Sequence, residues 1–153
     1  MAASGDNQEE VRLITVRAGS QDFGLDMLAV REIRGWSQPT PLPQAPHFVC
    51  GMVQLRGTVI PVIDLGDRLG LGRTSPSAKS VLVMVDHGTR LVGLLVDSVS
   101  DLAVLPKASL QPAPQLCDGA GSGFVDATAA LEGRILSILR LQSVIPELPA
   151  AAA

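Results

Sequence analysis

The sequence is poor in aromatic residues: it has no tyrosine, one tryptophan and three phenylalanines among 153 residues. Single-stranded nucleic acids bind largely by stacking their bases on aromatic rings, so this composition argues against such a binder. Charged residues make up only 18% of the chain and the formal net charge is −3. An acidic chain without a basic cluster is also a poor candidate for binding duplex DNA or an anionic membrane surface.

Residues suited to catalysis or metal binding are equally scarce. The two cysteines, Cys50 and Cys117, form no CxxC motif, and the two histidines, His47 and His87, lie far apart without Cys, Asp or Glu at ligand spacing. This favours reduced thiols in a cytoplasmic protein, no metal site, no cofactor and no enzymatic activity. The start of the chain shows no signal-peptide pattern, and no apolar run approaches the ~20 residues of a membrane helix.

What the chain has in abundance is short apolar runs between turns. Fifteen glycines and eleven prolines separate runs rich in Val, Ile and Leu at residues 11–16, 59–65, 81–85, 91–96 and 135–139. Such a pattern predicts an all-β barrel or sandwich. A short helix is expected at 64–71, a terminal turn at 141–148, and disordered tails at 1–10 and 149–153.

The chain also repeats itself. Shifted by 69 residues, segment 13–33 matches 82–102 with six identities, where roughly two would arise by chance at this composition. Segment 57–65 then matches 133–141 at an offset of 76, so the second copy holds extra residues, which we place in the glycine-rich loop 118–123. Each copy has enough strands for one small barrel, which predicts two five-stranded SH3-like β-barrels packed together. The alternative is a single sandwich with accidental similarity.

We therefore expect a first barrel at 11–78, completed by the C-terminal segment 141–148, and a second at 79–140. If their segments are neighbours, Glu32 and Arg56 could form an ion pair. That pair would be either an exposed brace or the charged rim of an apolar docking surface.

Four segments resemble the bacterial chemotaxis coupling protein family CheW. They are FGLDMLAVREIRG at 23–35, PHFVCG at 46–51, QLRGTVIPVIDL at 54–65 and VGLLVDSVSD at 92–101, with QPAP at 111–114 matching as well. The resemblance spans about 11–145 and implies two interlocked SH3-like barrels without catalytic activity. It implies a cytoplasmic adaptor, at receptor arrays on the inner face of the membrane, that couples the tips of methyl-accepting chemoreceptors to the regulatory domain of the chemotaxis histidine kinase.

The resemblance also implies contact residues. Those for the receptor, in an apolar seam between the barrels, are Val30, Glu32, Ile33, Arg56, Val81 and Gly93. Those for the kinase are Gly51, Leu102, Gln111 and Leu116. The family usually has a basic residue and an aromatic at the last two positions, which would weaken the second kinase contact. Other hypotheses are an accessory chemosensory pathway, a small β-barrel enzyme or ligand-binding domain using His87 with Asp86 or Asp97, and a nucleic-acid-binding barrel.

Overall fold

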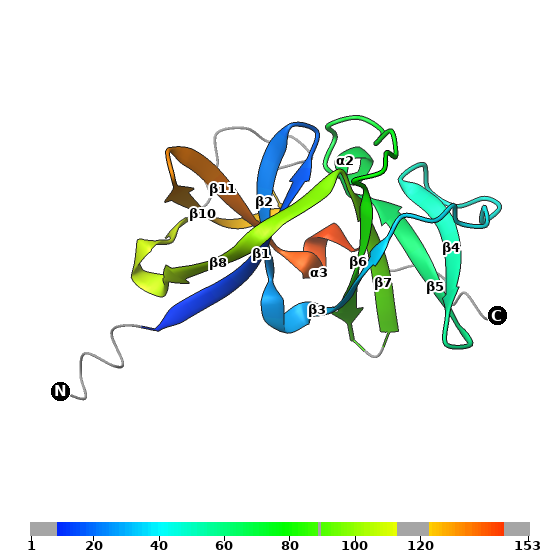
Figure 1. Ribbon diagram of the computed structural model, residues 1–153, viewed down its shortest axis with the longest axis horizontal. Coiled ribbons are helices and arrows are strands. Elements are labelled where there is room, and N and C mark those ends of the chain that lie inside the picture. The colour runs from blue at the N-terminus through cyan, green and yellow to red at the C-terminus, as the bar shows by residue number, and fades with distance from the viewer. Residues whose placement is uncertain (1–8, 89, 113–122, 146–153) are drawn as a thin grey trace.

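The computed structural model describes residues 9–88, 90–112 and 123–145, and its strands form two sheets (Figure 1). The expected contact Leu116, the thiol of Cys117 and nearly all of the tails and of the loop 118–123 lie outside these residues. The five predicted apolar runs fall in strands, except that the run 59–65 ends with Leu65, which begins a short helix. The fold is all-β with two SH3-like halves, as the sequence predicts.

We call the first half barrel I. Its sheet has the order β3-β6-β7-β5-β4. The strands are β3 (Val30–Gly35), β4 (Val49–Leu55), β5 (Thr58–Asp64), β6 (Val81–His87) and β7 (Arg90–Val96). Side chains from four of these strands fill its interior: Leu55, Ile60, Val62, Leu82, Met84 and Leu95.

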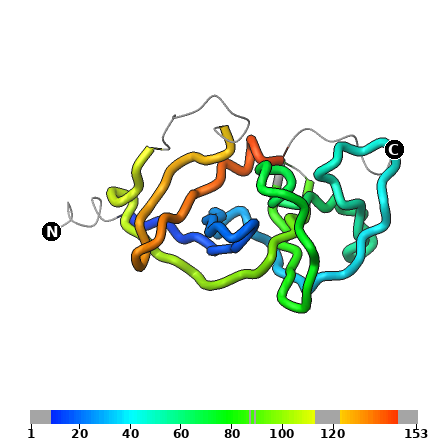
Figure 2. The backbone as a smooth tube through the Cα atoms, turned by 90° about the horizontal axis from the view of Figure 1, so that it is seen from above, coloured from blue at the N-terminus to red at the C-terminus, as the bar shows by residue number. Residues whose placement is uncertain are grey.

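Barrel II has the strand order β8-β1-β2-β11-β10-β9. The strands are β1 (Glu10–Ala18), β2 (Gln21–Asp26), β8 (Ser98–Pro106), β9 (Gln111–Pro112), β10 (Val125–Leu131) and β11 (Arg134–Leu139). Its sixth strand, β9, is only two residues long. Seen from above, the strands of this half curl around an interior, which holds Leu13, Ala103, Leu105, Ala129, Leu136 and Ile138 (Figure 2).

The sheets do not follow the expected division at residues 78 and 79. The hairpin β1–β2, from the first copy of the repeat, pairs with β8 and β11 of the second copy, and the hairpin β6–β7 pairs with β3 and β5 of the first. Each barrel therefore consists of one copy's hairpin and the other copy's remaining strands. Similar hairpins can pair with either copy, and sequence similarity alone does not distinguish the two arrangements.

The exchange explains why a glycine recurs at equivalent places. Gly24 on β2 lies opposite Ile138 on β11, and Gly93 on β7 lies opposite Val62 on β5, both in parallel pairs. A Cβ on Gly24 would be 3.1 Å from Leu13 Cδ1, and one on Gly93 would be 3.2 Å from Met84 Sδ. Both positions thus face the interior of their barrel.

A third apolar cluster fills the space between the barrels. It joins residues of both sheets, such as Leu25, Val83 and Leu94, to Val144 and Ile145 near the end of the described chain. Figure 1 shows the short helix α3 (Leu141–Val144) between the two sheets. The expected apolar seam is therefore packed with the protein's own side chains, so a partner helix would have to bind on the outer surface.

The remaining short elements are η1 (Met27–Ala29), α2 (Leu65–Arg68) and η2 (Lys107–Ser109). Helix α2 begins after Asp64, whose buried carboxylate accepts hydrogen bonds from Asp67 N, Thr74 N and Thr74 Oγ1. Helix α2 lies where the sequence predicts a helix and is shorter than expected, and α3 lies where a terminal turn is expected. Strand β1 starts at Glu10, one residue inside the expected tail. None of the helices in the described part of the chain is long and apolar enough to cross a membrane.

Candidate functional site

All six candidate receptor contacts lie in barrel I. Val30, Glu32 and Ile33 belong to β3, whereas Val81 is on β6, Gly93 on β7, and Arg56 in the turn between β4 and β5. Their exposure differs widely. Ile33 is 42% exposed, Val30 and Val81 pack against the cluster between the barrels, and Gly93 is buried. Only Glu32, Ile33 and Arg56 therefore offer much side-chain surface to a partner.

The ion pair that Glu32 and Arg56 could form if their segments were neighbours is present. Arg56 Nη1 lies 3.3 Å from Glu32 Oε1, and Arg34 Nη1 donates to Glu32 Oε2 over 2.9 Å. Strands β3 and β4 are the two edges of the sheet, so this contact links one edge to the hairpin at the other. The side chains are 27% (Glu32) and 76% (Arg56) exposed, so solvent screens most of the attraction.

A double-mutant cycle on Glu32→Ala and Arg56→Ala is expected to give a coupling of only about 0.5 kcal/mol in the free energy of unfolding. The measurement is chemical denaturation of the wild type, both single variants and the double variant. A coupling above roughly 2 kcal/mol would show that the ion pair stabilises the fold strongly, as a buried pair can, and contradict this expectation.

The candidate kinase contacts are scattered over both barrels. Gly51 is buried on β4, Leu102 is 46% exposed on β8, and Gln111 is exposed on β9. The φ angle of Gly51 is 146°, and a Cβ there would lie 2.2 Å from the carbonyl oxygen of Thr40. Gly51 is thus required by the backbone, and any effect on binding would pass through the shape of β4.

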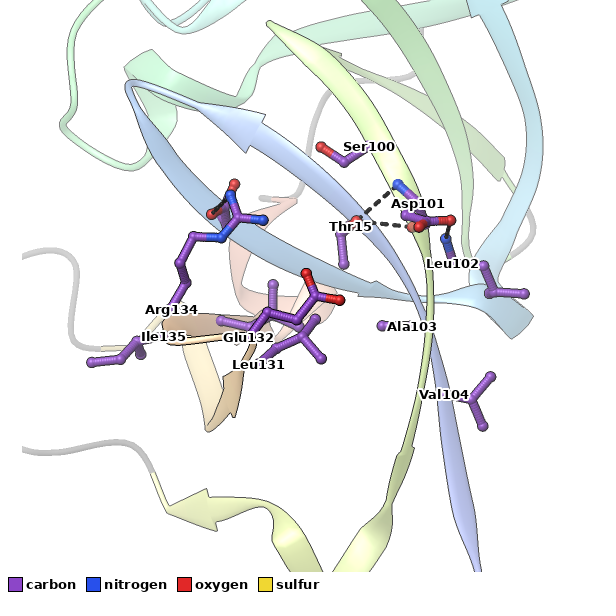
Figure 3. A pocket seen from close by; sticks show the side chains of 12 residues that line it. Thr15, Ser100, Asp101, Leu102, Ala103, Val104, Leu131, Glu132, Arg134 and Ile135 are labelled. Atoms are coloured by element: carbon purple, nitrogen blue, oxygen red, sulfur yellow. Dashed lines mark hydrogen bonds and ion pairs between the residues drawn. The ribbon is translucent and has the colours of Figure 1, made fainter.

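One feature missed by the sequence analysis is a hollow of about 320 Å³ in barrel II (Figure 3). It opens between β8 and the β10–β11 hairpin, and Leu102, the candidate kinase contact, lies on its edge. Glu132 and Ile135 also line it, and Ile135 is 72% exposed. The repeat could have indicated this site, because Ile135 matches Val59 and Glu132 matches Arg56 at the offset of 76.

The side chain of His87 lies outside the part of the structure that is described, and the other residues considered for chemistry have partners of their own. Asp86 is ion-paired with Arg31 over 2.5 Å, Asp97 accepts a hydrogen bond from Gly19 N, and His47 pairs with Asp67 over 3.1 Å. Within the described ranges, no three His, Cys, Asp or Glu side chains converge as a metal site would require.

Cys50 lines a separate hollow beside His47 and Arg73. Burial, reinforced by the nearby negative charge of Asp64, raises the pKa of the Cys50 thiol to about 11. The thiolate is the reactive form of cysteine, so Cys50 is poorly suited to nucleophilic or redox chemistry at neutral pH.

At pH 8, Cys50 in a Cys117→Ser background should react with a disulfide reagent about 100-fold more slowly in the folded than in the unfolded protein. The rate should rise with pH until about pH 11, where the folded thiol ionises. Since ionisation is easier in the unfolded chain, this group destabilises the fold as pH rises above about 9. Equal rates at pH 8 in buffer and in denaturant would contradict the assignment.

Comparison with known proteins adds independent information. A family model described as a CheW-like domain matches residues 12–148. The chain is 40% identical to "Chemotaxis protein CheW" of Rhizobium meliloti (strain 1021), over 88% of this chain and 86% of the relative. It is 35% identical to "Probable chemotaxis protein CheW" of Rhizobium etli, over 96% and 95% of the two chains. The solved structure of scaffolding protein TtCheW from Thermoanaerobacter tengcongensis superposes with a TM-score of 0.82 at 28% identity, covering 89% of this chain and 92% of that one.

Proposed function

The chain belongs to the CheW family and is a chemotaxis coupling protein; from this we propose that it joins the cytoplasmic tips of methyl-accepting chemoreceptors to the regulatory domain of the chemotaxis histidine kinase. It would act in the cytoplasm, at receptor arrays beneath the membrane, as a scaffold without catalytic activity. The observation that carries this proposal is the match to the family over nearly the whole chain.

The geometry of barrel I supports a receptor contact. Ile33 and Val59, 42% and 40% exposed, lie on the two strands that flank the Glu32–Arg56 ion pair. An apolar surface beside paired charges suits the side of an amphipathic helix. Val81 and Gly93 would support this surface from behind, Val81 by packing against the cluster between the barrels and Gly93 from the interior of barrel I.

The proposed kinase contacts are on the other barrel and on β4. Leu102 offers an exposed apolar side chain, and Gln111 lies on the edge strand β9. Receptor and kinase could therefore bind at the same time, because Ile33 and Leu102 are on different barrels. A coupling protein transmits a signal only if its contacts differ between the active and inactive kinase states.

Ile33→Asp is expected to abolish binding of a receptor-tip fragment, because it buries a charge at the centre of the proposed contact. It should leave kinase binding and the circular dichroism spectrum unchanged. Ile33 is a better position than Val30, whose side chain helps to fill the cluster between the barrels. The measurement is titration of the purified chain with each partner.

The matched control is Leu28→Asp, which places the same charge at a leucine that is 89% exposed on η1. It should bind both partners as the wild type does. The proposal fails if the wild-type chain binds neither the receptor tip nor the kinase regulatory domain at about 100 μM, far above the range of specific complexes.

A further inference from the structure

The two barrels end in equivalent hairpins. The β4–β5 turn contains Arg56 and Gly57, and the β10–β11 turn contains Glu132 and Gly133, at the repeat offset of 76. Arg56 and Glu132 share a left-handed backbone, with φ angles of 51° and 52°. The two turns therefore hold their first residue in the same conformation.

The strands that face these hairpins are equivalent too. The pairing of β3 with β6 shifts between Val30 and Glu32, and the pairing of β1 with β8 shifts between Val99 and Asp101. These bulges lie 69 residues apart, and bulges redirect the side chains that follow them. In barrel II, Thr15 Oγ1 accepts a hydrogen bond from Asp101 N and donates one to Asp101 O (Figure 3).

The charges at these equivalent positions differ. In barrel I, Arg56 meets Glu32 at 3.3 Å and links the hairpin to the opposite edge. In barrel II the corresponding residues are Glu132 and Asp101, two carboxylates of like charge. Neither has an ion-pair partner among the residues that the structure describes, and the hollow of about 320 Å³ lies where barrel I has its ion pair.

The walls of this hollow combine an apolar floor with an acidic rim. Ala103, Leu131 and Leu136 line it, and Figure 3 shows the Glu132 side chain between Arg134 and Asp101. The charge of Arg134 is opposed by Asp22 at 3.2 Å, and Asp22 also contacts Arg17 at 3.4 Å. The three carboxylates of Asp22, Asp101 and Glu132 outnumber these two guanidinium groups, so the net charge of the rim is negative.

Exposed apolar side chains flank the hollow on both sides. Leu102 and Val104 on β8 are 46% and 45% exposed, and Ile135 on β11 is 72% exposed. An acidic mouth beside exposed apolar groups fits a protein surface that presents a basic side chain next to apolar ones. It does not fit an acidic or purely apolar surface.

We propose that a lysine or arginine of the kinase regulatory domain enters this hollow between Asp101 and Glu132, in the place that Arg56 occupies in barrel I. This rests on the proposed function, which assigns the neighbouring Leu102 to the kinase. Glu132 is then a specificity-determining residue: its charge makes the end of barrel II a site for a basic side chain, whereas Arg56 fills the same site in barrel I.

The test is Glu132→Arg. Arginine fits this backbone, as Arg56 shows at nearly the same φ, and the new side chain can pair with Asp101 and close the hollow. Affinity for the kinase regulatory domain should fall at least about tenfold, because the variant replaces an attractive charge by a repulsive one. The melting temperature should stay the same or rise, and binding of the receptor tip should not change.

Glu132→Gln, which removes the charge and keeps the shape, should weaken kinase binding about threefold and make it less sensitive to salt between about 50 and 300 mM. The control Glu10→Arg makes the same reversal at an exposed residue outside the hollow and should have no effect. Wild-type affinity in Glu132→Arg, or equal loss of receptor and kinase binding, would overturn the inference and leave the proposed function standing. If the wild type itself does not bind the kinase, the proposed function fails and the inference fails with it.

Discussion

Gly51→Ala is expected to cost about 3 kcal/mol or more in the free energy of unfolding and to leave little folded protein at 37 °C. The φ angle of Gly51 is 146°, in a region that only glycine adopts readily. The added Cβ would lie 2.2 Å from Thr40 O, the oxygen that accepts a hydrogen bond from Met52 N. Relief of the clash must move the backbone, because the obstacle is a carbonyl group. Thermal and chemical denaturation measure the effect.

Gly57→Ala is the matched control. Gly57 also has a positive φ, 82°, but no atom lies within 4 Å of the position of its Cβ. The expected cost is therefore the backbone strain alone, about 1 kcal/mol. Similar losses at both positions would show that strain, and not the contact with Thr40, determines the effect at Gly51. If Gly51→Ala is folded and only kinase binding is lost, Gly51 is a direct contact instead.

Much of the fold could be predicted from the sequence because the sequence contains an internal repeat. Runs of β-branched residues mark strands wherever they occur, and the repeat showed that the strands form two similar sets. The ion pair between Glu32 and Arg56 could also be considered from the sequence, because both are charged residues next to apolar segments of the same copy. Local pattern and duplication together thus indicate both the fold class and one ion pair between distant segments.

The exchange of hairpins between the copies could not be predicted in the same way. Pairing β1 with β3 or with β8 buries similar side chains, so the choice depends on how the whole chain packs. The need for a glycine at position 51 could not be predicted from the sequence for a related reason. The matching residue in the second copy is Ala127, and the contact that excludes a side chain at Gly51 comes from Thr40, which forms an antiparallel bridge with Met52 on β4.

The contacts of Arg68 also could not be predicted from the sequence, because nothing in the neighbouring residues indicates that its side chain joins the two barrels. It lies at the end of α2, between β5 and β6 of barrel I, with its guanidinium 4.7 Å from the ring centres of both Phe48 and Phe124. Arg68 Nε donates to Val144 O over 2.7 Å and Arg68 Nη2 to Ser143 O over 3.0 Å. Phe124 precedes β10 of barrel II, so a single side chain links both halves to α3. Partial burial lowers the pKa of Arg68, yet the group stays charged at physiological pH.

Arg68→Ala should therefore destabilise the protein by about 2–4 kcal/mol, through loss of two cation–π contacts and two charge-assisted hydrogen bonds. Arg68→Lys should recover only part of this, because an ammonium group cannot stack between two rings and reach both carbonyls. Arg12→Ala, at an exposed arginine on β1, is the control and should change stability by less than about 0.5 kcal/mol. Denaturation curves of the three variants decide the matter, and a lysine variant as stable as the wild type would show that charge alone suffices. Because α3 lies in the cluster between the barrels, we further expect Arg68→Ala to increase amide exchange in α3 before it does so within either sheet.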